Sequence, residues 1–162
     1  MKSTGICSNM ARNIWKVVFA IAMIAFVSGV KAQDVGRQVI LTPDAPKPIG
    51  PYSQAIRRGQ TIYLSGQIAI DPATNQFLSN GSIEDQTRRV LNNLTAVLAA
   101  DGLTMDDVVS MTVFLKDMND FPKMNEVYAT YFKNAPPARA AVEVARLPRD
   151  AKIEISAIAV AP

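Results

Sequence analysis

Apolar and polar residues alternate with a period of two along six short segments, which is typical of strands with one buried face. Two longer segments show helical spacing, because apolar side chains recur there every three or four residues. The strand-like segments are residues 37–42, 53–58, 61–67, 108–116, 139–146 and 152–160, and the helical segments are residues 83–101 and 121–132. This order predicts an α+β fold, with a single mixed β-sheet and two helices packed on one face.

Local signals mark the ends of the helical segments. Ser82 is a favourable cap, and Asp85 three residues later completes a capping box of approximate form. Gly102 is placed to end this first helix. Pro122 falls in the first turn of the second helix, where its missing N–H costs nothing.

Alternation near the C-terminus separates a polar row from an apolar one. Arg139, Ala141 and Glu143 share one face of the predicted strand, and valines such as Val142 occupy the other. We expect the valines to face the core, and the arginine row to lie on a polar face that also carries Ser65. The Arg139 guanidinium is suited to gripping a carboxylate through two parallel hydrogen bonds. A structural ion pair with Glu143 is the alternative.

The N-terminal residues resemble a secretion signal more than part of a fold. Three basic residues and no acidic ones precede an apolar run of 14 residues, 17–30. That run is short for a membrane span and suitable for a signal peptide, and the small residues up to Ala32 favour cleavage after that position. We therefore predict a signal peptide at 1–32, one domain at 33–162, and a periplasmic or secreted location. An uncleaved anchor is the alternative.

Composition excludes several classes of site. The chain has 17 basic and 14 acidic residues, but removal of the leader leaves 13 basic residues, so the basic pI gives no reason to expect nucleic-acid binding. The single cysteine, Cys7, lies in the leader, and the chain has no histidine. Catalytic triads, thiol nucleophiles and histidine metal sites are thus excluded, and we expect no metal and no cofactor.

Four separated motifs then point to a known family. They are PIGPYSQA at 48–55, SGQ at 65–67, VFLKDMNDF at 113–121 and PARAAVEVARLP at 137–148. In this order they resemble the RidA/YjgF family of reactive-intermediate deaminases, over roughly residues 37 to 160. The resemblance implies a RidA/chorismate-mutase-like fold and a homotrimer with a pocket at each subunit interface.

The resemblance also implies a reaction, the hydrolysis of 2-imino or enamine acids to 2-oxoacids and ammonia without a cofactor. Arg139 would anchor the substrate carboxylate, and Glu154 would assist the attacking water. The residues expected to bind the substrate are Tyr52, Ser65, Gly66, Asn125 and Ala141.

The residues alone leave other roles open. Glu154 could simply pair with Lys152, and Tyr52 could pack in a turn. Ser65 and Gly66 could mark only a β-bulge or a close backbone approach. Asn125 would ordinarily face solvent.

Two positions depart from the family pattern. Ala141 stands where the deaminase subgroup commonly has cysteine, and Ser156 stands where it commonly has glutamate. These changes bear on substrate range more than on the reaction. The alternative function is a module that binds small carboxylates or 2-oxoacids without turnover, and a weaker alternative is an endoribonuclease or translation inhibitor. We expect no nucleic-acid partner, and no membrane partner once the signal is cleaved.

Overall fold

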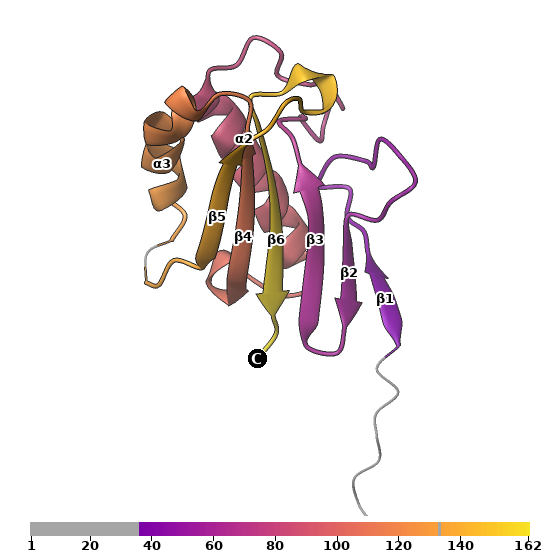
Figure 1. The fold of residues 1–162 in the computed structure, drawn as a ribbon. Coiled ribbons are helices and arrows are strands. Elements are labelled where there is room, and N and C mark those ends of the chain that lie inside the picture. Colours follow the sequence, from indigo (N-terminus) through magenta and orange to yellow (C-terminus); the bar gives the residue numbers. More distant parts are fainter. Residues whose placement is uncertain (1–35, 133) are drawn as a thin grey trace, which may run out of the picture. The chain divides into compact units, whose positions relative to one another are not determined.

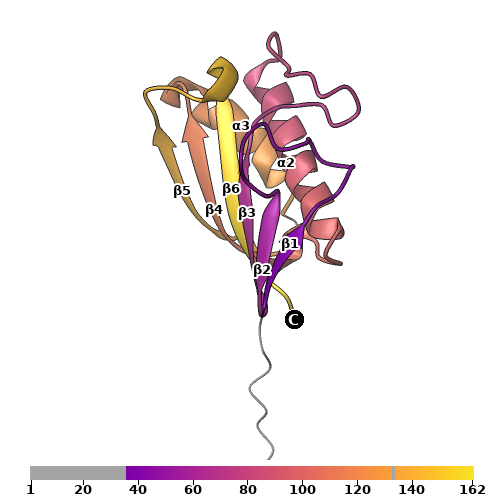
Figure 2. The same ribbon diagram turned by 90° about the vertical axis from the view of Figure 1, so that its right-hand side faces the viewer.

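The computed structural model describes residues 36–132 and 134–162, so the predicted leader lies outside the described residues. The described chain forms one six-stranded sheet in the order β1-β2-β3-β6-β4-β5 (Figure 1). The α+β prediction is confirmed, because both helices lie on the same side of this sheet (Figure 2). No helix within the described ranges is long and apolar enough to cross a membrane.

The elements follow the predicted segments closely, with small shifts at their ends. The strands are β1 Arg37–Ile40, β2 Ala55–Arg58, β3 Thr61–Gln67, β4 Val108–Leu115, β5 Ala138–Glu143 and β6 Ile153–Val160. The helices are α2 Ile83–Ala99 and α3 Phe121–Ala129, with short 3-10 turns η1 Met105–Asp107, η2 Met118–Asp120 and η3 Pro148–Asp150. All neighbouring strands are antiparallel except β4 and β5, which are parallel and joined through α3. A parallel pair requires such a crossover.

Both helices begin where the local signals predicted. The Ser82 hydroxyl accepts a hydrogen bond from the Asp85 N–H at 3.1 Å, and the Asp85 carboxylate accepts one from the Ser82 N–H at 3.3 Å. This reciprocal pair is the predicted capping box. Pro122 lies in the first turn of α3, as expected.

The main core lies between the sheet and α2. The predicted apolar face of α2 is buried, and β4 contributes Met111, Val113 and Leu115 to the same core. Val109, which strict alternation with Met111 would place on that face, is instead half exposed, because the pairing of β4 with β6 is irregular between Val108 and Ser110. A bulge of this kind reverses the alternation before it.

The orientation predicted for β5 is wrong. Arg139 pairs with Met111 of β4, whose side chain is buried on the helix side, and Ala141 packs against the main core. Val142, expected to be buried, is 43% exposed on the other face, which we call the open face. The predicted alternation is right, but the two rows face the opposite sides of the sheet from those predicted. The reason is that α3 covers this edge, and Arg139 stacks on its aromatic rings. Arg139 therefore does not share a face with Ser65.

Candidate functional site

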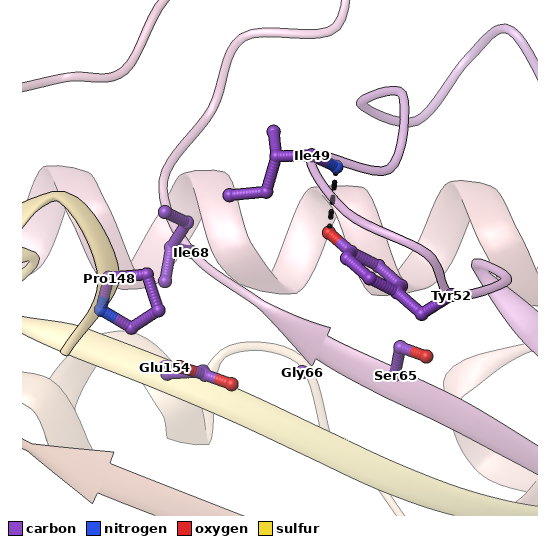
Figure 3. A pocket seen from close by; sticks show the side chains of 7 residues that line it. All are labelled: Ile49, Tyr52, Ser65, Gly66, Ile68, Pro148 and Glu154. Carbon is purple, nitrogen blue, oxygen red and sulfur yellow. Dashed lines mark hydrogen bonds between the residues drawn. The ribbon is translucent and has the colours of Figure 1, made fainter.

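A cleft of about 290 Å³ opens where β3, β6 and the loop before β2 meet (Figure 3). We call it the Glu154 cleft. It contains four of the predicted site residues together with three apolar side chains. Its lining residues are Ile49, Tyr52, Ser65, Gly66, Ile68, Pro148 and Glu154.

Among the described residues, Glu154 is the only charged side chain that lines this cleft. It alternates with the buried Ile153 and Ile155 of β6, so its own side chain stands on the open face. The carboxyl forms no hydrogen bond or ion pair with any described residue, and the expected alternative, a pair with Lys152, is not present within that part of the chain. Burial raises the pKa of Glu154 above its ordinary value of 4.5. A carboxyl of this kind is suited to exchanging protons with a reactant near neutral pH.

The wall opposite Glu154 is a loop held by its own hydrogen bonds. The Tyr52 hydroxyl accepts from the Ile49 N–H at 3.2 Å, so the ring lies across the mouth of the cleft (Figure 3). Tyr52 thus packs against its own turn, as the alternative role required, and it also lines the cleft with 44% of its surface exposed. The Ser65 hydroxyl donates to the Ser53 carbonyl at 2.7 Å, which ties β3 to the same loop.

Gln54 organises this loop from beneath. Its side chain is 1% exposed. Its Oε1 accepts from the Thr42 N–H at 2.7 Å, and its Nε2 donates to the carbonyls of Thr42, Ala45 and Pro46 at 3.0, 3.2 and 2.9 Å. Its backbone carbonyl accepts from the Ser65 N–H at 3.0 Å. Gln54 therefore joins the start of the loop, through its side-chain amide, to the strand that carries Ser65, through its backbone carbonyl.

A second cavity, of about 500 Å³, lies between α3 and the start of β5. We call it the Arg139 pocket. It contains two predicted site residues, Arg139 and Asn125. Its lining residues are Asn125, Tyr128, Ala129, Phe132, Pro136, Pro137 and Arg139.

Arg139 rests on aromatic rings and has no carboxylate partner within the described chain. Its guanidinium carbon lies 4.4 Å from the centre of the Tyr128 ring and 5.6 Å from that of Phe121. The expected alternative, an ion pair with Glu143, is wrong, because the Glu143 carboxylate instead accepts from the Met118 N–H at 2.8 Å. Burial raises the pKa of Tyr128, and the neighbouring Arg139 offsets part of the rise. The stacked guanidinium keeps its hydrogen-bond donors available for an anion.

The predicted site residues therefore fall into two groups on one chain. Glu154 stands on the open face, whereas Arg139 stands on the helix side, and the two cavities share no lining residue. Ala141 lines neither cavity, because its side chain packs against the core. Asn125 lies beside Arg139, as the family pattern implies.

Sequence reasoning missed several lining residues. Ile49 lay within the first motif, and its place beside Tyr52 there was the available signal. Tyr128 follows Asn125 by three residues on α3, a spacing that places both side chains on one helix face. Ile68 and Pro148 come from segments distant in sequence, and no local signal joined them.

Comparison with known proteins places the chain in a family. The family model described as endoribonuclease L-PSP matches residues 42–161. A RutC family protein of Pyrococcus horikoshii is 59% identical over 123 residues, covering 76% of this chain and 97% of that protein. The 2-iminobutanoate/2-iminopropanoate deaminase of Mus musculus is 50% identical over 124 residues, covering 76% of this chain and 91% of the relative.

The structural comparison agrees. The crystal structure of E. coli TdcF with bound serine superposes with a TM-score of 0.74 at 43% sequence identity, covering 77% of this chain and 99% of that chain. The predicted family is thus confirmed by sequence and by fold. The chain belongs to the endoribonuclease L-PSP family, which is the RidA/YjgF family.

Proposed function

We propose that this protein hydrolyses small 2-imino acids to 2-oxoacids and ammonia. The observation that carries the proposal is Glu154, a half-buried carboxyl with a raised pKa that faces an open cleft and has no partner among the described residues. Relatives named 2-iminobutanoate/2-iminopropanoate deaminase, at 45–50% identity, support this reaction class. The serine bound to the E. coli relative is a ligand of similar size that also carries a carboxylate.

The reaction requires little beyond positioning and proton transfer. The substrate carries a carboxylate beside an electrophilic C=N bond. Water adds to this carbon, and the ionised Glu154 accepts one of its protons and passes it to the nitrogen. Glu154 then transfers the hydroxyl proton of the adduct to the nitrogen as the C–N bond breaks, so that both water protons leave on ammonia and the carbonyl remains. Arg139 holds the substrate carboxylate, and the orientation that it imposes lowers the barrier.

Arg139 and Glu154 of one chain stand on opposite faces of the sheet, so the proposed site is completed between copies. The Arg139 pocket of one copy would meet the Glu154 cleft of the next. The open face favours such an assembly, because it exposes apolar side chains that association would cover. These exposed residues include Val39, Tyr63, Val142 and Val160. A homotrimer, as the family resemblance implies, gives every subunit one such neighbour on each side.

The reaction is tested by generating 2-iminobutanoate with an amino-acid oxidase and following its conversion to 2-oxobutanoate. We expect the rate to rise in proportion to the concentration of this protein. Arg139→Ala should abolish the increase while the chain stays folded and assembled. Decay of the imine that does not change over a wide range of protein concentration would refute the proposal.

Mixing inactive variants tests where the site lies. Arg139→Ala and Glu154→Gln should each be inactive alone. If each site takes one residue from each of two copies, random mixing and reassembly restores about a quarter of the sites. Activity that stays at zero after subunit exchange has been verified by mass would contradict the shared site.

A binding module without turnover is the second candidate, and Ala141 and Ser156 favour it slightly. Arg139 would hold a 2-oxoacid equally well without chemistry. Calorimetry with 2-oxobutanoate beside the imine assay separates the two functions. The family description also names an endoribonuclease. After leader removal the chain has one more acidic than basic residue, which gives that activity little electrostatic support.

The proposed leader fixes where such a reaction would occur. A chain cleaved after Ala32 would work in the periplasm or outside the cell, where cytosolic imines do not reach it. The substrate must then come from oxidation of amino acids in that compartment. Growth on an amino acid that is oxidised there, with and without this protein, tests whether imine accumulates.

A further inference from the structure

The strand β3 carries an irregularity next to Glu154. Leu64 pairs with Ala157 of β6, and Gln67 pairs with Ile155. Two residues of β3, Ser65 and Gly66, therefore stand opposite one residue of β6, which defines a β-bulge. The regular pairing of β3 with β6 is thus interrupted at the Glu154 cleft, which Ser65 and Gly66 both line.

The Glu154 carboxyl lies directly over Gly66 in this bulge. A Cβ atom placed on Gly66 would overlap Oε1 of Glu154, and it would lie 2.9 Å from Cδ and 3.2 Å from Cγ of the same side chain. All three nearest atoms belong to this one carboxyl group and its methylene. A methyl group at Gly66 would therefore move the end of a flexible side chain and leave the backbone in place.

We propose that Gly66 is a positioning residue: the space left by its missing side chain holds the Glu154 carboxyl against the bulge and directs it into the cleft. The inference deepens the proposed hydrolysis and rests on it, because Glu154 is the group that would move protons.

Few ionisable groups surround Glu154, so its pKa is a suitable measure of where its carboxyl lies. Tyr52 is the only other titratable side chain that lines the cleft. Across β4, Glu154 pairs with the uncharged Phe114. Lys152 projects to the same side two residues earlier but forms no ion pair with Glu154, and Asp150 is paired with Lys116 at 2.6 Å. A carboxyl displaced from the bulge would gain water, so its pKa should fall toward the ordinary value.

The test compares Gly66→Ala with Gly36→Ala, since nothing lies within 4 Å of a Cβ placed on Gly36. The Glu154 carboxyl is titrated by ¹³C NMR, with Glu154→Gln to assign its signal, and kcat and KM are measured against pH. We expect Gly66→Ala to stay folded, to lower the pKa of Glu154, to shift the acidic limb of the profile to lower pH, and to reduce kcat by about 10–100-fold. Gly36→Ala should match wild type.

A shorter acid provides the rescue. In the double variant Gly66→Ala with Glu154→Asp, the shorter side chain should clear the methyl group, so the loss in kcat should be smaller than the product of the single losses. Unchanged titration and an unchanged profile in Gly66→Ala would overturn the inference. A variant that fails to fold would overturn it as well, because the displacement would then involve backbone. If the wild-type protein shows no turnover, the proposed function fails. The titration still tests whether Gly66 positions the Glu154 carboxyl.

Discussion

Replacing the buried Gln54 by methionine should loosen the wall of the Glu154 cleft at a measurable cost in stability. Methionine has nearly the same shape, so packing is largely kept, but it cannot make the side-chain hydrogen bonds of the amide. The change leaves one N–H and three carbonyl groups of the loop without this partner, those of Thr42, Ala45 and Pro46.

The size of the loss follows from those contacts. A neutral hydrogen bond contributes about 0.5–1.5 kcal/mol net, and a buried group left without a partner costs about 1–3 kcal/mol. Some of the freed carbonyls will reach water, because the loop lies near the surface. We therefore expect the free energy of unfolding to fall by about 2–4 kcal/mol. With a urea dependence of about 2 kcal/mol per molar, the unfolding midpoint should fall by about 1–2 M.

Circular dichroism during urea unfolding measures this difference. The matched control is Gln76→Met, because Gln76 is exposed and its side chain makes no hydrogen bond with the described residues. All variants must be compared at one protein concentration, since assembly adds to apparent stability. If Gln54→Met and Gln76→Met unfold within about 0.5 kcal/mol of each other, the central role assigned to the amide is wrong.

Three further outcomes can be measured. Tyr128→Leu should raise KM for the imine by about tenfold, because Arg139 loses a ring contact of about 0.5–2 kcal/mol and its fixed orientation, whereas Tyr128→Phe should stay close to wild type. Asp71→Asn should lower the unfolding midpoint at neutral pH: hydrogen bonds, the largest from the Thr74 backbone N–H, hold the pKa of Asp71 below its ordinary 3.8. Because a lowered folded-state pKa stabilises the fold above the unfolded value, this difference should disappear as pH falls through the folded pKa. Intact-mass analysis of fractionated cells should find the chain cleaved after Ala32 outside the cytoplasm, and full-length chain in the cytosol alone would contradict the leader.

Local sequence determined the elements and much of the core. The capping box at Ser82 and the proline at 122 set where the helices begin, because their effects act within one turn. Alternation along residues 108–116 places Met111, Val113 and Leu115 on one face of the strand, and this row is buried in the structure. The motifs identified the family and, through it, six of the residues that line the two cavities.

The tertiary structure decided which way the polar rows point. A period of two shows which residues share a face, but it does not show which face meets the helices. Arg139 lies on the helix side because β5 pairs in parallel with β4 under the aromatic residues of α3, a contact between distant segments. The bulge at Gly66 likewise depends on the pairing of β3 with β6. The separation of Arg139 from Glu154 thus follows from strand register and helix packing, which form only when the whole sheet assembles.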